Sequence, residues 1–159
     1  MEPRPVDEST AIMTEMVMPN DANALGNCMG CRVMHLIDIA AAIAARRHAR
    51  ATCVTAAIDE IVFHHPVPVW SVLVLQASVN HAGNTSMEVG VRVEMESAAS
   101  GLRSHCASAY MTFVAMDENG RPTPVPPLLA RTKEQQRRQR EAAERRARRL
   151  ARLRGKNRG

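Results

Sequence analysis

The longest apolar stretch of the chain, residues 33–45, predicts one long helix in the protein interior. It contains neither proline nor glycine, follows shortly after Gly30, and ends at the basic residues 46–48, where the helix dipole favours cations. A helix that is apolar on nearly every side is normally buried. Asp38 is the one acid in this stretch, and burying a carboxylate is costly unless it is paired or reaches solvent. Asp38 is therefore either a functional acid or a residue that faces outward at the helix edge.

Five further stretches predict strands, at residues 11–18, 52–63, 69–81, 86–96 and 103–116. The segment M-E-V-G-V-R-V-E-M-E, within the fourth of these, alternates apolar and polar residues with period two. This alternation indicates an antiparallel strand with one buried face. The predicted order is one strand, the long helix and four consecutive antiparallel strands. A single apolar helix against one antiparallel sheet is an α+β fold.

The length of 159 residues and the hydrophobic content of 45% allow one domain, which we place at residues 11–130. Residues 1–10, with their prolines and scattered acids, are expected to form a flexible N-terminus. A tight turn at residues 117–120 and an extended proline-rich segment at residues 121–127 close the domain. Residues 131–159 form a tail whose Arg-, Glu- and Ala-rich composition predicts a helix through most of its length.

The net charge of +5 combines two parts of opposite sign. Residues 1–130 carry 8 Lys and Arg against 13 Asp and Glu, a net charge of −5, whereas residues 131–159 carry 13 against 3, a net charge of +10. The tail could bind RNA or another polyanion, because a run of cations attracts phosphates. It could also be a solvated extension that adds solubility or packs on a neighbouring subunit. We favour the second interpretation, because the tail has no aromatic side chains on which bases could stack.

The apolar stretches and the cysteines bear on whether the protein is a membrane, exported or metal-binding protein. There is no charge-free apolar stretch of about 18 residues and no basic-then-apolar signal segment, so we expect a cytoplasmic protein without a membrane partner. Cys28 and Cys31 form a C-x-x-C pair with His35 four residues later, but Cys53 and Cys106 stand alone. A structural zinc site would need a second ligand pair at a recognisable spacing. We therefore expect no metal site and interpret the cysteines as small buried thiols.

A series of short motifs runs in order through roughly residues 13–130. They are P-N-D-A-N at 19–23, L-G-N at 25–27, Gly30, D-I-A-A-A at 38–42, V-T-A at 54–56, Asp59, Phe63, H-P at 65–66, N-T-S-M-E-V at 84–89, A-Y at 109–110, T-F-V-A at 112–115 and D-E-N-G-R-P-T-P-V-P-P at 117–127. Together they resemble the hotdog-fold acyl-CoA thioesterases, in the branch that contains the brain-type cytosolic acyl-CoA hydrolase and its bacterial relatives. The resemblance implies a sheet wrapped around the central helix and hydrolysis of fatty acyl-CoA to free CoA and a carboxylic acid.

The resemblance also implies an assembly. Some relatives carry two hotdog units in one chain, but this sequence has no internal repeat. The minimal unit is therefore expected to be a homodimer, and the usual further step in the family is a trimer of dimers, a homohexamer.

The site residues follow from the same resemblance. Asp38 corresponds to the catalytic acid of the family, as general base or as nucleophile, and Asn23 to a residue that orients water or substrate from the other chain of the dimer. The backbone N–H groups around Gly30 and Cys31, at the helix start, would bind the oxyanion. CoA is part of the substrate, so no cofactor is expected. The residues expected to contact CoA are Thr55 and Ala56, beside the pantetheine, and Asn84, Thr85 and Ser86, near the nucleotide.

One departure from the family bears directly on activity. Cys31 stands where relatives have the second residue of a Gly-Gly pair, and its Cβ would be strained if that position required a positive φ. Asn23 also has a simpler interpretation as an ordinary Asx turn. The departure at Cys31 motivates a second hypothesis, a hotdog protein that binds acyl-CoA, or a polyanion through its tail, without turnover. A hotdog dehydratase is disfavoured, because no motif of a histidine and an acid accompanies the match.

Overall fold

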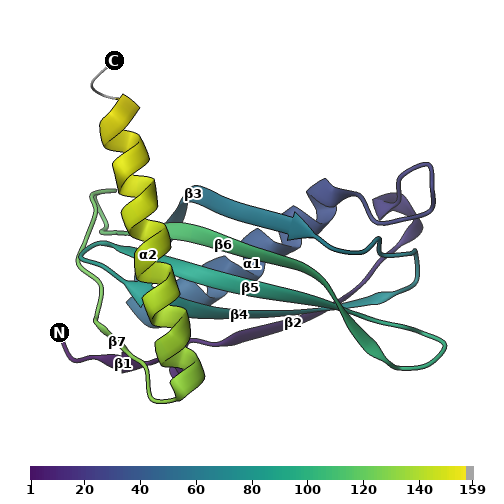
Figure 1. The fold of residues 1–159 in the computed structure, drawn as a ribbon, viewed down its shortest axis with the longest axis horizontal. Coiled ribbons are helices and arrows are strands. Elements are labelled where there is room, and N and C mark those ends of the chain that lie inside the picture. The colour runs from purple at the N-terminus through teal and green to yellow at the C-terminus, as the bar shows by residue number, and fades with distance from the viewer. Residues whose placement is uncertain (157–159) are drawn as a thin grey trace.

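Five antiparallel strands form one sheet, and the helix α1 (Gly30–Ala49) lies along one of its faces (Figure 1). The structure is a computed structural model and describes residues 1–156. The strands are ordered β2-β4-β5-β6-β3, so that β2 and β3 are the edges. Their bounds are β2 Ala11–Met16, β3 Thr52–Phe63, β4 Val72–Ala82, β5 Ser86–Glu96 and β6 Arg103–Met116. The predicted α+β hotdog fold is confirmed. β4 begins three residues later than predicted, because the turn before it includes Trp70 with a left-handed φ of 72°.

α1 packs only one of its faces against the sheet. Its buried residues are Val33, Leu36, Ile37, Ala40, Ala41, Ala44, Ala45 and His48. The many alanines allow the helix to approach the strands closely. The prediction of a helix buried on every side is wrong for the single chain, because the sheet covers one side only, and Met34 and Ile39 are 39% and 37% exposed. The uncovered side also carries Asp38, which is partly exposed.

Residues 4–10 pack on the domain, although the sequence predicts a flexible end there. β1 (Arg4–Pro5) pairs in parallel with β7 (Leu128–Leu129), and the 3-10 helix η1 (Val6–Glu8) follows. Val6 is buried, and the guanidinium of Arg4 donates to the backbone carbonyl of His48 at the end of α1. These partners are distant in the sequence, so local composition gave no sign of them.

His48 joins the end of α1 to the proline-rich segment that precedes β7. Its ring Nε2 lies 2.8 Å from the carbonyl oxygen of Pro126, and the ring is buried. Burial, together with the nearby Arg4 guanidinium, lowers the pKa of His48 below its usual value. Burial and the Arg146 guanidinium lower the pKa of His81 in the same direction.

We expect the protein to lose stability as the pH falls below about 6.5, the ordinary pKa of histidine. In that range the unfolded chain binds protons at His48 and His81 while the native chain does not, so the free energy of unfolding decreases until the lowered native pKa values are reached. Each unit of pKa lowering is worth about 1.4 kcal/mol. Urea unfolding at about pH 7.5 and about pH 5.5 measures the loss, and His48→Gln should show a smaller one. Equal losses in the two proteins would contradict the assignment to His48.

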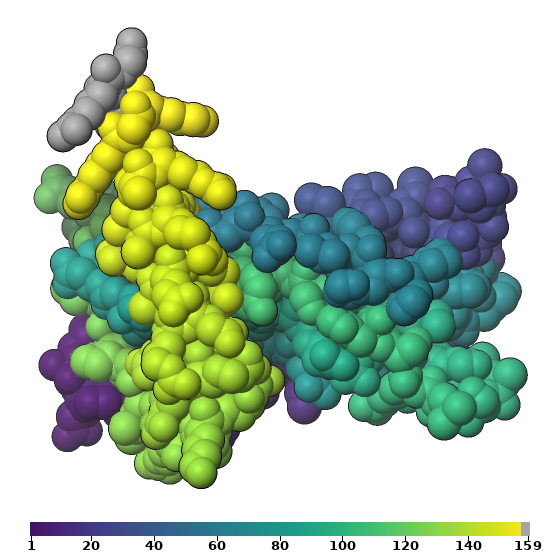
Figure 2. All heavy atoms as spheres, viewed as in Figure 1, coloured from purple at the N-terminus to yellow at the C-terminus, as the bar shows by residue number. Residues whose placement is uncertain are grey.

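The predicted helical tail is confirmed as α2 (Lys133–Lys156), which crosses the face of the sheet opposite α1 (Figure 1). At its start Gln135 Nε2 donates to Asp7 Oδ1 at 2.8 Å, and the helix then passes over the strands toward β3. The space-filling view shows its last turns projecting beyond the strands (Figure 2). Residues 157–159 of the predicted tail lie outside the described residues. None of the described helices is both long enough and apolar enough to cross a membrane.

Candidate active site

Asp38 and Thr55 meet between α1 and the edge strand β3. The hydroxyl of Thr55 donates to Oδ1 of Asp38 across 2.7 Å. Thr55 lies on the α1 side of the sheet, because it pairs with Phe113 of β6, which is buried in the core. The bond holds one carboxylate oxygen, while Oδ2 has no hydrogen-bond partner among the described residues. A carboxylate held in this way at a partly exposed position can accept a proton from water.

This contact was missed in the sequence, where Thr55 is predicted only as a neighbour of the pantetheine. Period two along the strand places Thr55 on the same face as Cys53. That pattern could have predicted that Thr55 faces the helix, but not that it contacts Asp38.

The start of α1 presents two backbone N–H groups that have no acceptor within residues 1–156, those of Gly30 and Cys31. By contrast, the N–H groups of Arg32 and Val33 both reach the carbonyl of Met29, at 3.0 and 3.2 Å. Free N–H groups at the positive end of a helix dipole are suited to bind an oxyanion. Cys31 has no positive φ, so its Cβ causes no backbone strain, and the residue keeps its N–H in a helical backbone.

Asn23 lies in the turn before α1 and forms the Asx turn of the simpler interpretation. Its Oδ1 accepts hydrogen bonds from the backbone N–H of Leu25 at 2.9 Å and of Asn27 at 3.2 Å. The side chain is exposed, and its Nδ2 makes no hydrogen bond to the described part of the chain. The turn thus fixes the amide oxygen and leaves the amide N–H groups available to another molecule.

Within one chain, the helix start and Asp38 lie too far apart to act on the same carbonyl group. Asp38 follows Gly30 by eight residues of α1, and at about 1.5 Å per residue this separates them by about 12 Å. An oxyanion donor and a base that activates water must both lie within about 3 Å of the atoms they serve. The helix start of the same chain therefore cannot serve a carbonyl group that is positioned at Asp38.

The residues predicted to contact CoA lie at the same end of the sheet as Thr55. Val114 of β6 pairs with Ser86 on one side and with Val54 on the other, so the two lie about 10 Å apart across three strands. Backbone bonds fix the hairpin that precedes Ser86, since the carbonyls of Asn84 and Thr85 accept from Val125 at 2.8 Å and Ala115 at 3.0 Å. Ala56 is exposed on β3.

The four cysteines are separate thiols in the structure. Burial raises the pKa of Cys53 and of Cys106 to about 11, and burial together with the Asp21 carboxylate raises the pKa of Cys28. These three thiols are therefore protonated at neutral pH and are weak nucleophiles. Cys31 differs from the predicted buried thiols because it is exposed at the start of α1. Among the described residues, no group of three or more His, Cys, Asp or Glu side chains could hold a metal ion.

Comparisons with known proteins identify the family. A family model described as "Thioesterase superfamily" matches residues 25–101. The uncharacterized acyl-CoA thioester hydrolase YkhA of Bacillus subtilis is 38% identical over 84% of this chain and 78% of its own length. A hexameric acyl-CoA thioesterase solved without ligand is 38% identical, with a TM-score of 0.92 over 96% of this chain and 98% of its own.

A third similar protein, the acyl-CoA hydrolase of Staphylococcus aureus, is known in complex with butyryl-CoA, CoA and CoA disulfide. It is 32% identical, with a TM-score of 0.91 over 98% of this chain and 94% of its own. It has also been solved as three variants in which an aspartate, an asparagine or a threonine is replaced by alanine. The identity and coverage of these matches, together with the fold and the arrangement around α1, show that this chain belongs to the thioesterase superfamily, among its acyl-CoA thioester hydrolases.

Proposed function

We propose that this protein is a cytoplasmic acyl-CoA thioesterase whose active site is completed by two chains. The observation that carries the proposal is the 2.7 Å hydrogen bond from Thr55 to Asp38, on the uncovered side of α1. In the S. aureus hydrolase, the asparagine, aspartate and threonine that were replaced by alanine are separated along the chain by the same numbers of residues as Asn23, Asp38 and Thr55. This equal spacing supports roles in the reaction for all three residues here.

In the proposed reaction, Asp38 acts as general base and takes a proton from a water molecule, whose oxygen attacks the thioester carbonyl carbon. The N–H groups of Gly30 and Cys31 from the second chain stabilise the negative charge on the carbonyl oxygen. Asn23 of that chain lies close to its helix start and orients the water or the substrate with its free Nδ2. The intermediate then collapses, the C–S bond breaks, and the CoA thiolate takes up the proton held by Asp38.

The surface of the single chain supports the assembly that this reaction needs. β3 is an edge strand that exposes several large apolar side chains, and Met34 and Ile39 of α1 are exposed as well. Those of β3 are Val54, Ile58, Val62 and Phe63, each between 38% and 48% exposed. An exposed apolar edge strand is a template for pairing with another chain. We therefore propose a homodimer through β3 and α1 and, by analogy with the hexameric neighbours, a trimer of dimers.

The remaining features of the proposal concern CoA and the organisation of the chain. CoA enters as part of the substrate, and the reaction as written needs no cofactor. Its pantetheine would follow β3 past Ala56, and its nucleotide would lie toward the hairpin of Asn84, Thr85 and Ser86. The catalytic unit would comprise residues 11–130, with residues 131–159 as an accessory tail.

The proposal is tested by release of free CoA thiol from acyl-CoAs of increasing chain length, with wild-type protein. We expect turnover with at least one class of acyl chain, because the base and the oxyanion donors are both present. Binding of CoA without turnover of any acyl-CoA would instead establish the non-catalytic hotdog protein. A Cys31→Gly variant measured in parallel should keep hydrolysis, since Cys31 acts through its backbone N–H. Turnover that appears only in the variant would instead show that the Cys31 side chain makes the wild type non-catalytic.

A further inference from the structure

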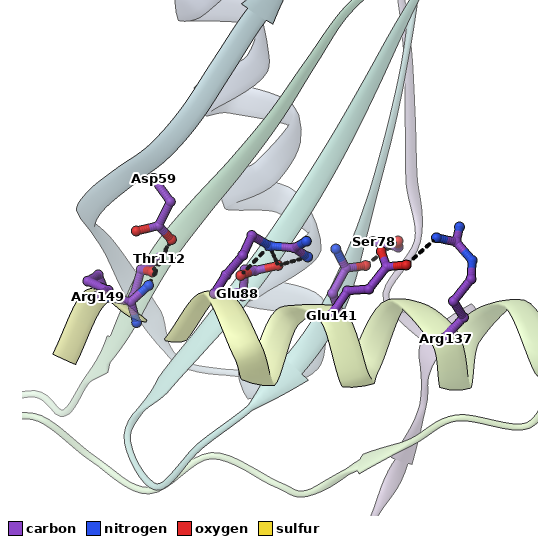
Figure 3. Close-up of polar contacts among 9 residues, drawn as sticks. Asp59, Ser78, Glu88, Thr112, Arg137, Glu141 and Arg149 are labelled. Atoms are coloured by element: carbon purple, nitrogen blue, oxygen red, sulfur yellow. Dashed lines mark hydrogen bonds and ion pairs between the residues drawn. The ribbon is translucent and has the colours of Figure 1, made fainter. Parts of the chain in front are cut away.

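The last two turns of α2 extend beyond the edge of the sheet. Arg145 pairs with Glu88 of β5 and Arg149 with Asp59 of β3, both at 2.7 Å, so α2 has reached the last strand at Arg149 (Figure 3). Residues 150–156, which we name the overhang, continue past that strand (Figure 1). At about 1.5 Å per helical residue and about 4.8 Å between strands, the overhang spans the width of about two further strands.

The overhang continues the helix face with which α2 contacts the sheet. Residues three or four apart lie on one face of a helix, so Arg152, Leu153 and Lys156 follow Arg145 and Arg149. Together with residues 56–60 of β3, they line a hollow of about 900 Å³. Leu153 is 54% exposed there, and neither Arg152 nor Lys156 has an ion-pair partner within the described residues. Beyond Arg149, this face of α2 therefore borders a hollow at the edge of the sheet and forms no ion pair with the sheet in the described residues.

The outer face of β3 offers a surface of opposite charge. Glu60 points to the same side of the sheet as α2, because it pairs with Tyr110, whose ring lies 3.7 Å from the guanidinium of Arg145. Glu60 is exposed and pairs with no cation in residues 1–156. A second copy that joins along β3 would extend the sheet beneath the overhang and bring its own Glu60 there.

We propose that the overhang of each chain clamps the second copy of the homodimer. Arg152 and Lys156 face the acidic outer side of that copy's β3, around its Glu60, and Leu153 packs against the same strand. The inference rests on the proposed function, because it uses the dimer that completes the active site. The charges favour this occupant: the overhang has three cations and no acid, whereas residues 1–130 of each chain carry a net charge of −5. By two-fold symmetry, each chain provides one clamp and receives one.

The clamp can be tested by mixing two complementary variants. One carries a reversed overhang, Arg152→Glu with Lys156→Glu, and the other carries Glu60→Lys. A homodimer of either variant sets like charges against each other in both clamps, whereas the mixed dimer pairs opposite charges in both. Chains of distinguishable mass are mixed, and the dimers are counted by native mass spectrometry after dissociation of larger assemblies. Random mixing gives twice as many mixed dimers as each homodimer. We expect the ratio of mixed dimers to each homodimer to exceed this random value by about fivefold or more, and added salt should reduce the excess.

The matched control is Lys133→Glu with Arg140→Glu, which makes the same change of charge at two exposed α2 positions that lie outside the overhang and do not line the hollow. Mixed with Glu60→Lys, this control should give random proportions. Random proportions for the reversed overhang as well would overturn the clamp, because contacts within one chain predict no preference for the mixed dimer. If in that case single-stranded poly(U) bound the wild type and not the reversed overhang, the overhang would be a nucleic-acid element. Failure of the proposed function would be seen separately, as a wild type that is monomeric or that hydrolyses no acyl-CoA.

Discussion

Replacing Asp38 by asparagine is expected to lower kcat for acyl-CoA hydrolysis by about 10²- to 10⁴-fold, the usual contribution of a positioned general base. Asparagine keeps the shape of the side chain and an oxygen that can accept the hydrogen bond from Thr55, but it cannot take a proton from water. The loss should therefore appear in kcat, with KM nearly unchanged, because binding of CoA does not use the carboxylate. Thiol release at saturating acyl-CoA measures it, and the mass of the assembly is determined in parallel.

Two further variants show whether the effect is specific. Thr55→Val removes the donor and leaves the acid, so it should cost less, about tenfold, as expected for a residue that positions Asp38. Glu118→Gln makes the same acid-to-amide change in an exposed turn and should leave the rate unchanged. Hydrolysis by Asp38→Asn at the wild-type rate would exclude Asp38 as the base. A loss of rate that accompanies a loss of the dimer would reassign Asp38 to assembly.

Much of the fold could be predicted because its signals are local. The apolar stretch before Arg46 and the period-two alternation from Met87 to Glu96 each reflect the face that a helix or strand buries against its own neighbours. Asp38 stood out for the same local reason, as one acid in an apolar helix. By contrast, the burial of Val6 and the ion pair between Arg149 and Asp59 join segments far apart in the sequence, and nothing local specifies which partners meet.

The proposed active site depends on both kinds of signal, local and long-range. The register of β3 against β6 turns Thr55 toward Asp38, and register is set by the whole sheet rather than by the residues around Thr55. The prediction that α1 is buried on every side fails for a related reason. An apolar helix face indicates that the face is covered, but it does not indicate whether the same chain covers it. In the proposed homodimer, the exposed Met34 and Ile39 would be covered by the second chain.

Replacing Arg145 by leucine is expected to lower the free energy of unfolding by about 3–5 kcal/mol, because it leaves a buried carboxylate without its partner. Glu88 on β5 is 3% exposed, and both its oxygens accept from Arg145, with Nε 3.2 Å from each and Nη2 2.7 Å from Oε1. Removal of the guanidinium also removes its contact with the ring of Tyr110. Urea unfolding monitored by circular dichroism measures the loss, and the earliest change should be melting of α2, which this ion pair holds on the sheet.

A double variant at the same site distinguishes the cost of leaving a buried charge unpaired from the cost of lost packing. In Glu88→Leu with Arg145→Leu, neither charge of this ion pair remains, and two apolar side chains face each other across the same contact. Removal of both partners of a buried ion pair is often close to neutral, so the double variant should recover most of the stability that Arg145→Leu loses. The exposed pair of Arg137 with Glu134 supplies the comparison on the same helix: Arg137→Leu should change little, since water solvates the carboxylate that is left behind. If the double variant were as unstable as Arg145→Leu alone, the cost would lie in the packing of α2, and the ion pair would not be what fastens the tail to the catalytic domain.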